Sequence, residues 1–151
     1  ERYEISAYAK EKMRCQHNMN YWQYADYLGI GAGAHGKVTS AAGEIYRSQR
    51  CKSPKFYLRQ ANMQVTQKLV PYEEQLFELL LNHFRLMQKP LSRSIVESRS
   101  QWTWAQACNK FAEAEAKGWL HMEPDQVMLT DLGARFYNDV LELFLAAQPT
   151  A

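Results

Sequence analysis

The stretch CQHNMNYW, from Cys15 to Trp22, carries a thiol, an imidazole, two amides and two large aromatic side chains within eight positions. A haem needs an imidazole or thiolate for its iron and aromatic surface beside its ring. We therefore take His17 as the candidate iron ligand and Cys15 as the second choice. Aromatic-rich segments are also common in ordinary cores, so the residue types alone leave both interpretations open. The candidate ligand-binding set is Cys15, His17, Asn18, Tyr21 and Trp22, preceded by the cations Lys10, Lys12 and Arg14.

A glycine-rich segment, DYLGIGAGAHG, follows. It matches the Gly-x-Gly-x-x-Gly pattern, but a dinucleotide site also needs a helix opening at the glycines and an acid about 20 residues later. Val38 and Thr39 favour a strand instead, and Pro54 and Lys55 stand where the acid would be. The segment is predicted to be an apolar strand ending in glycines that allow close approach of a ligand or another chain segment. The candidate cofactor-lining residues are Gly31, Gly33 and His35, the histidine lying, like His17, in a loop.

Other reactive side chains do not assemble into a catalytic motif. Cys15 and His17 could share a face of an extended segment, but no acid or oxyanion element accompanies them. We assign no catalytic residues. The three cysteines are odd in number and far apart, which argues against a disulfide framework and a Cys-x-x-Cys clamp. His83 and His121 have no second ligand at metal-binding spacing.

Charge divides the 151 residues into a basic and an acidic half. Residues 1–70 carry eleven Lys and Arg against five acids, and residues 71–151 carry seven against eleven. The basic half suits an anionic partner or the acidic half of the same molecule. No apolar run approaches the ~18–20 residues of a membrane span, and no signal segment opens the chain. We expect a cytoplasmic protein.

Hydrophobic periodicity predicts an α+β fold, in which the segment before about residue 69 is mainly strands and the segment after it is mainly helices. Before it we expect a strand over 3–8, a hairpin turning at Ala42 and Gly43, and a short helix from Pro54. The first strand begins at once with nothing before it to pair with, so we expect the C-terminal piece of a longer chain. After it we expect helices over 71–87, 92–100 and 104–117, two strands around Pro124, and a helix over 131–146.

Helix, helix, helix, β-wing, helix is a winged-helix pattern, which raises the possibility of DNA binding. The recognition helix would be 104–117, where Lys110 and Lys117 are offset by Glu113 and Glu115. A DNA-binding helix needs an excess of cations. Nucleic acid is therefore not an expected partner, and a winged-helix regulator is the weakest alternative.

Several separated motifs in the same order resemble a known family. YEISAYA, CQHNMNYW, DYLGIGAGAHG and GWL…LTDLGARFYNDVLELFL are similar to the C-terminal portion of the oxygen-independent coproporphyrinogen III oxidase-like family of radical S-adenosylmethionine proteins. The string His17-Asn18-x-x-Tyr21-Trp22 is similar to the signature of its haem-chaperone branch. The resemblance implies a partial (β/α) barrel that holds a [4Fe–4S] cluster and S-adenosylmethionine, followed by a helical, winged-helix-like C-terminal domain. Residues 1–69 would be the end of the barrel, and residues 70–151 that second domain.

The resemblance implies haem binding and delivery to acceptor proteins, with oxidative decarboxylation of coproporphyrinogen III as the alternative. One departure matters: the Cys-x-x-x-Cys-x-x-Cys cluster motif of the family is absent. We therefore expect the rest of the barrel to lie outside this sequence, and we expect no radical chemistry from this chain alone. The expected partners are a tetrapyrrole, the N-terminal barrel and haem-acceptor proteins. Exposed strand edges also predict self-association.

Overall fold

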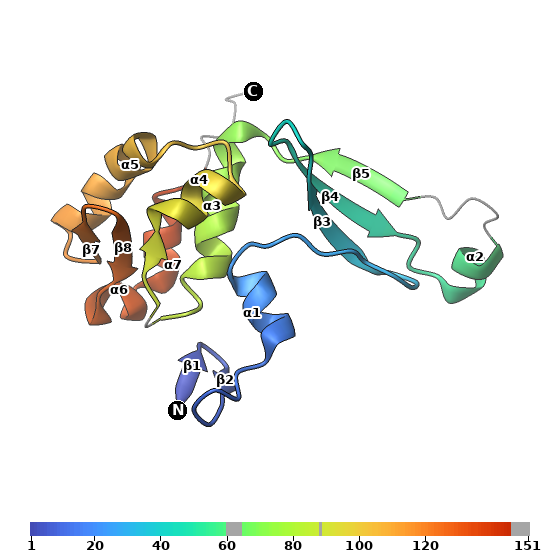
Figure 1. Cartoon of the computed structure of the whole chain (residues 1–151), viewed down its shortest axis with the longest axis horizontal. Coiled ribbons are helices and arrows are strands. Elements are labelled where there is room, and N and C mark those ends of the chain that lie inside the picture. The colour runs from blue at the N-terminus through green and yellow to red at the C-terminus, as the bar shows by residue number, and fades with distance from the viewer. Residues whose placement is uncertain (60–64, 88, 146–151) are drawn as a thin grey trace.

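A computed structural model describes residues 1–59, 65–87 and 89–145 as a mixture of helices and small antiparallel sheets (Figure 1). The elements in chain order are β1 (Arg2–Glu4), β2 (Ala7–Tyr8), α1 (Gln16–Trp22), β3 (His35–Thr39), β4 (Ile45–Arg50), α2 (Pro54–Arg59), β5 (Val65–Leu69), α3 (Tyr72–His83), β6 (Leu91–Ser92), α4 (Arg93–Arg99), α5 (Trp104–Ala116), β7 (Leu120–Glu123), β8 (Gln126–Leu129), α6 (Asp131–Arg135) and α7 (Tyr137–Glu142). Within these ranges, no helix is both long and apolar enough to cross a bilayer.

The chain opens with a hairpin where the sequence predicts one strand. β1 pairs antiparallel with β2, so the first strand finds its partner within the chain itself. The turn forms because the Glu4 carboxylate accepts hydrogen bonds from the Ser6 backbone N–H at 3.1 Å and the Ser6 hydroxyl at 2.9 Å. The prediction of one strand over residues 3–8 was wrong, since local side-chain bonding turns the backbone between them.

β3, β4 and β5 form a three-stranded antiparallel sheet in that order. The predicted hairpin is confirmed as β3 and β4, and its turn contains Gly43 with a φ of 82°. β5 completes the sheet by pairing with β4, from Tyr46 opposite Leu69 to Arg50 opposite Val65. The sequence did not predict β5, because VTQKL is short and has little apolar alternation.

The strand predicted before the glycines does not form. Only Tyr27 makes an isolated bridge, to Lys37, and β3 begins after the glycine segment rather than before it. Gly31 and Gly33 have φ values of 104° and 73°, which lie outside the extended region. The backbone therefore loops between Tyr27 and β3.

The predicted helices of the second half are confirmed with shorter bounds. α3 ends at His83 instead of residue 87, and the last predicted helix divides into α6 and α7 at Phe136. α5 starts with a capping box, in which Thr103 and Gln106 bond each other's backbone N–H groups. It stops before Gly118, whose φ of 71° favours glycine. β6 joins β7 and β8 in a sheet of order β6-β8-β7.

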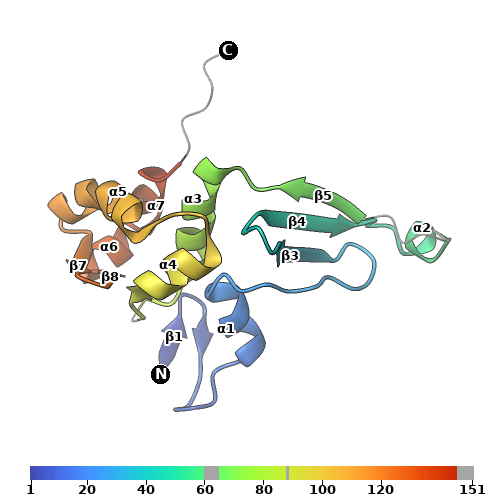
Figure 2. The ribbon, with the colours of Figure 1, turned by 45° about the horizontal axis from the view of Figure 1, so that its top comes forward.

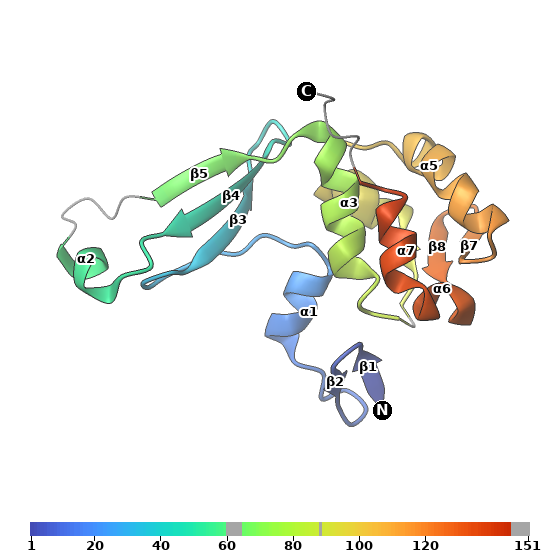
Figure 3. The ribbon, with the colours of Figure 1, turned by 180° about the vertical axis from the view of Figure 1, so that it is seen from behind.

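The hydrophobic core lies mainly around α3. Figures 2 and 3 show α3 between the β3–β4–β5 sheet on one side and α5, α6 and α7 on the other. α1, α4 and α7 all contact α3. The core cluster draws on Leu76, Leu79 and Leu80 of α3, and Tyr24 and Ile45 are its members from the first 69 residues.

Candidate functional site

α1 carries most of the candidate site. The sequence placed His17 in a loop, but it lies in α1, one turn before Tyr21, so the two side chains are neighbours on the helix surface. Their rings meet edge to face with centroids 4.7 Å apart. Tyr21 in turn meets Tyr27 edge to face at 4.3 Å. We call these three residues, His17, Tyr21 and Tyr27, the aromatic ladder; its first member is exposed to solvent.

The other half of the candidate set occupies a neighbouring face of α1. Asn18 and Trp22 are also four residues apart, about 100° around the helix from His17 and Tyr21. The Trp22 ring packs beneath the Arg85 guanidinium, 4.5 Å from its centroid. Its indole N–H is buried and has no hydrogen-bond partner among the residues that the structure describes. The structure therefore brings His17 and Tyr21 together and separates them from Asn18 and Trp22.

The thiol of Cys15 stands at the N-terminal end of α1. It is exposed and makes no capping hydrogen bond to the helix, although the Cys15 carbonyl accepts the first helical bond, from Met19. A thiol in this position is open to a ligand from solvent. It is two residues from His17, but the backbone at Cys15 is extended, with ψ 110°, whereas His17 lies within the helix.

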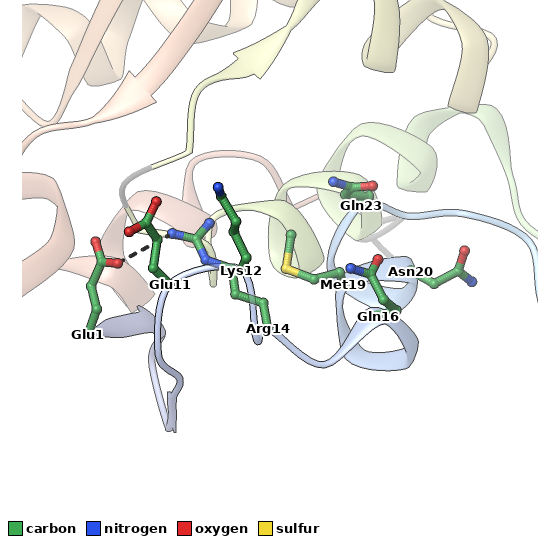
Figure 4. A pocket seen from close by; sticks show the side chains of 8 residues that line it. All are labelled: Glu1, Glu11, Lys12, Arg14, Gln16, Met19, Asn20 and Gln23. Carbon is green, nitrogen blue, oxygen red and sulfur yellow. Dashed lines mark ion pairs between the residues drawn. The ribbon is translucent and has the colours of Figure 1, made fainter.

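A cavity of about 450 Å³ opens beside the face of α1 that carries Gln16, Met19, Asn20 and Gln23, and His17 does not line it (Figure 4). Arg14 there forms an ion pair with Glu1 at 4.0 Å, so two of the charges compensate each other. Lys12 and Arg14, two of the cations predicted to accompany the iron ligand, therefore lie in the loop before α1 and line a cavity that His17 does not line. The cavity is lined by Glu1, Glu11, Lys12, Arg14, Gln16, Met19, Asn20 and Gln23.

The glycine segment approaches its own chain. A Cβ atom at Gly29 would overlap the His35 carbonyl, and one at Gly36 would lie 2.5 Å from the Ser48 hydroxyl. Gly31 has open space around it, and Gly33 has only Lys52 nearby. The positive φ angles of Gly31 and Gly33 therefore explain their presence. Strand β3 follows the glycines where a dinucleotide site needs a helix.

A second cavity, of about 600 Å³, lies between the β3–β4 hairpin and α3. His35, predicted to lie in a loop, is the first residue of β3, and its exposed side chain lines this cavity. Tyr27, the last member of the aromatic ladder, also lines it. We call this space the sheet–helix cavity. Its lining residues are Tyr27, His35, Gly36, Arg47, Glu74, Phe77, Glu78, Leu81 and Leu145.

A polar cluster fixes the wall of this cavity. Glu78 accepts hydrogen bonds from the Tyr24 hydroxyl at 2.8 Å and from the Arg47 guanidinium at 2.7 and 3.0 Å. A further N–H of Arg47 donates to the Tyr27 hydroxyl at 3.0 Å. Burial, and then the negative charge of Glu78, raises the pKa of Tyr24 far above its ordinary value. The Tyr24 hydroxyl is therefore a neutral, fixed donor.

A buried lysine holds the adjoining loop. Lys37 is 1% exposed and donates to Asp26 at 2.8 Å, with its ammonium 4.2 Å from the Tyr24 ring centroid. Burial lowers the pKa of Lys37, and the Asp26 carboxylate opposes that shift. Sequence reasoning missed Tyr24, Lys37, Arg47 and Glu78, because none of them stands at a spacing that indicates a site.

The cysteines do not fit an iron–sulfur cluster. Cys15 is exposed, Cys51 and Cys108 are partly buried, and all three are free thiols. In the described ranges, no three His, Cys, Asp or Glu side chains converge as metal ligands. His83 is fully buried, and burial lowers its pKa to about 4, while His121 is exposed on β7.

Comparison with known proteins shows which proteins this chain is related to. No protein-family model matches the chain. It is 38% identical over 148 residues to a protein of Haemophilus influenzae named heme chaperone HemW, covering 98% of this chain and 38% of that protein. The protein of the same name from Escherichia coli is 36% identical over 151 residues, with 97% and 38% covered. The chain is homologous to the HemW proteins. The resemblance expected from the sequence is thus confirmed, and the chain spans about 38% of the length of these curated relatives.

A solved structure supports the fold. The chain resembles the coproporphyrinogen III oxidase HemN from Escherichia coli, described as a radical SAM enzyme, with a TM-score of 0.51. The match covers 80% of this chain and 28% of the oxidase at 15% sequence identity. At that identity the likeness concerns the fold. The mixed α and β architecture predicted from the sequence is therefore confirmed in its coarse form.

Proposed function

We propose that this chain is part of a haem chaperone and that it binds haem, as cargo, through α1. Similarity to HemW proteins along nearly the whole chain supports the class of ligand. The observation that carries the proposal is the exposed imidazole of His17, held edge-on against Tyr21 at 4.7 Å. A carrier must release its cargo, and an exposed ligand on a surface helix permits exchange.

The roles follow from the positions on α1. His17 is the iron ligand and Cys15, with its exposed thiol, is the alternative. The Tyr21 ring packs against the macrocycle beside the iron. Asn18 and Trp22 lie on the neighbouring face, where they contact an edge of the ring. Gly31, Gly33 and His35 line the approach from the glycine segment.

We further propose two structural units, residues 1–69 and 70–151. The core cluster takes nearly all its members from Val70 onward, which supports a boundary between β5 and α3. The first unit corresponds to the end of a radical-SAM barrel. In the second, the order α3, β6, α4, α5, β7, β8, with β6 beside the β7–β8 hairpin, supports a winged-helix-like domain.

The remaining partners lie outside this chain. The N-terminal part of the parent protein would carry the [4Fe–4S] cluster and S-adenosylmethionine, because the cysteines here do not fit the cluster. Acceptor proteins would receive the haem. The outer edge of β5 is the candidate for strand pairing with another copy, because Tyr27 already bridges Lys37 on the outer edge of β3.

Coproporphyrinogen III oxidation in the parent is the second candidate function, favoured by the structural likeness to HemN. The two functions differ in what they require of His17. A porphyrinogen has no iron, so it makes no use of an axial imidazole. Iron ligation by His17, seen as a shifted Soret band that is lost in His17→Ala, therefore identifies haem.

The test is a haem titration of the chain by absorption spectroscopy. The chaperone proposal expects saturable binding with a shifted Soret band, weakened at least tenfold in His17→Ala. His121→Ala, which removes an exposed imidazole from β7, is the matched control and should bind as the unaltered chain does. Cys15→Ala separates the thiol from the imidazole. No saturable binding by the unaltered chain would overturn the proposal, and binding of iron-free coproporphyrin that is insensitive to His17→Ala would favour the oxidase.

A further inference from the structure

We propose a second haem position in the sheet–helix cavity, where His35 ligates the iron. The inference rests on the proposed function, since it takes a haem as the ligand. It adds a second site, separate from the one at His17. The geometry that points to it is the shared residue Tyr27. Tyr27 belongs both to the aromatic ladder on α1 and to the wall of the cavity.

The size and walls of the cavity suit a flat macrocycle. About 600 Å³ lies within the usual range of ligand pockets, ~300–1,000 Å³. Phe77 and Leu81 of α3, together with Leu145, form an apolar wall. On the opposite wall, Tyr27, His35 and Arg47 face the cavity, and the direction in which a Gly36 side chain would extend is occupied by the Ser48 hydroxyl. One apolar face of a tetrapyrrole would therefore lie on the wall formed by Phe77 and Leu81, and the other would face His35.

His35 supplies the ligand for the iron. In the β3–β4 register His35 pairs with Gln49 and Lys37 pairs with Arg47. Residues two apart on a strand point to the same face, so His35 projects on the face that carries Lys37 and Arg47. Its ring is exposed and makes no hydrogen bond to any side chain or backbone atom within the described part of the chain. A histidine imidazole is an established axial ligand of haem iron, as in globins and peroxidases.

The charges around the cavity direct the propionates. Arg47 donates three of its five N–H groups to Glu78 and Tyr27, so two N–H groups remain for a carboxylate. Lys68 of β5 is opposite Arg47 in the sheet, and its side chain is exposed on the same face. Glu74 on α3 repels a carboxylate from the other side. The propionates therefore point toward the sheet.

The aromatic ladder connects the two positions. From His17 to Tyr21 and from Tyr21 to Tyr27, the rings follow one another at centroid distances of 4.7 and 4.3 Å. A haem released by His17 meets aromatic surface along the whole way to the cavity. The exposed position would receive or release the cargo and the cavity would retain it.

The test is a haem titration of four chains: unaltered, His17→Ala, His35→Ala and the double variant. The proposal expects two phases in the unaltered chain, one phase in each single variant, and none in the double variant. If His17→Ala removes all binding, the second position is wrong and the proposed function stands. If His35→Ala removes all binding and His17→Ala removes none, the cavity is right and the ligand assigned on α1 is wrong.

A filled cavity gives an independent readout. Leu81 is 40% exposed, so Leu81→Trp can be accommodated while its indole occupies the cavity. It should remove the His35-dependent phase and leave the His17-dependent phase intact. Leu132→Trp is the control, because Leu132 is 43% exposed on α6 and lines neither cavity. Unchanged two-phase binding by Leu81→Trp, with unfolding midpoints equal to those of the control, would overturn the proposal.

Discussion

Arg47 of β4 and Glu78 of α3 join the sheet to the helical core. The guanidinium donates two hydrogen bonds to one carboxylate oxygen, at 2.7 and 3.0 Å, and the Tyr24 hydroxyl donates a third to the same oxygen. The two side chains are 32% and 22% exposed, so water screens the pair only partly. This junction forms one wall of the sheet–helix cavity, and its loss would release the sheet from α3.

Glu78→Gln should therefore lower the free energy of unfolding by about 2 kcal/mol, the typical value of a hydrogen bond to a charged group. The amide keeps the shape of the side chain but loses the charge that matches Arg47. Urea unfolding followed by circular dichroism measures the change. Glu113→Gln removes an exposed partner of Lys117 on α5 and should cost much less. Equal effects of the two changes would show that the junction contributes no more than a surface pair.

His83 should make stability depend on pH. Burial lowers its pKa to about 4, and its Nε2–H donates to the Pro90 carbonyl at 3.2 Å. In the unfolded chain this imidazole binds a proton as the pH falls through about 6.5, whereas in the folded chain it stays neutral until about pH 4. The free energy of unfolding is therefore highest above pH 6.5 and decreases as the pH drops toward 4. About 2 kcal/mol should be lost between pH 7.5 and 5.

The measurement is urea unfolding at pH 7.5, 6.0 and 5.0, beside His83→Leu. The variant has no imidazole to titrate, so its stability should change little over this range. His121→Ala should keep the full pH dependence, because it leaves the buried His83 in place. A dependence that persists in His83→Leu would assign the effect to other groups.

Sequence periodicity predicted the elements whose residues are close in the chain. Leu76, Leu79 and Leu80 recur at helical spacing and become core, and the β3–β4 hairpin follows from its turn. α1 was not foreseen, because its first turn carries no acid and no side-chain cap. It is a short helix that packs on α3, a contact between segments about 60 residues apart in the sequence.

The candidate site was predictable only in part. His17, Tyr21 and His35 stand out by residue type. The partners that position them do not: Tyr24 is 54 residues from Glu78 and Arg47 is 31 residues from it. Such contacts depend on how the sheet folds back on α3, which no local pattern records.

Arg85 should prove essential to the placement of Trp22. Arg85 pairs with Glu4, which is 2% exposed, and stacks on Trp22. Burial raises the pKa of Glu4, but the hydrogen bonds from Ser6 and Arg85 lower it by more. The net effect is a lowered pKa, so the carboxylate is charged. Arg85→Met would leave that charge buried without its ion-pair partner, at a cost of about 3 kcal/mol.

The double variant Glu4→Gln/Arg85→Met removes both charges and should recover part of that stability, as measured by urea unfolding. The fluorescence difference between each chain and its Trp22→Phe counterpart gives a local readout, because it removes the emission of the other three tryptophans. Loss of the stacked cation should change this difference. A double variant no more stable than Arg85→Met would mean that the stacking on Trp22, rather than the buried charge, carries the stabilisation.

Gly29 should tolerate no side chain. A Cβ atom there would overlap the His35 carbonyl at the start of β3, while the Gly29 carbonyl accepts a hydrogen bond from Arg50 at 2.6 Å. Gly29→Ala should therefore displace the His35 backbone and cost about 2 kcal/mol, as overpacking usually does. Ala32→Ser, at an exposed position of the same loop, should cost little. Since a side chain at Gly29 displaces the His35 backbone, Gly29→Ala should also weaken the His35-dependent phase of haem binding. An unchanged phase would show that the conformation of this loop does not affect binding in the cavity.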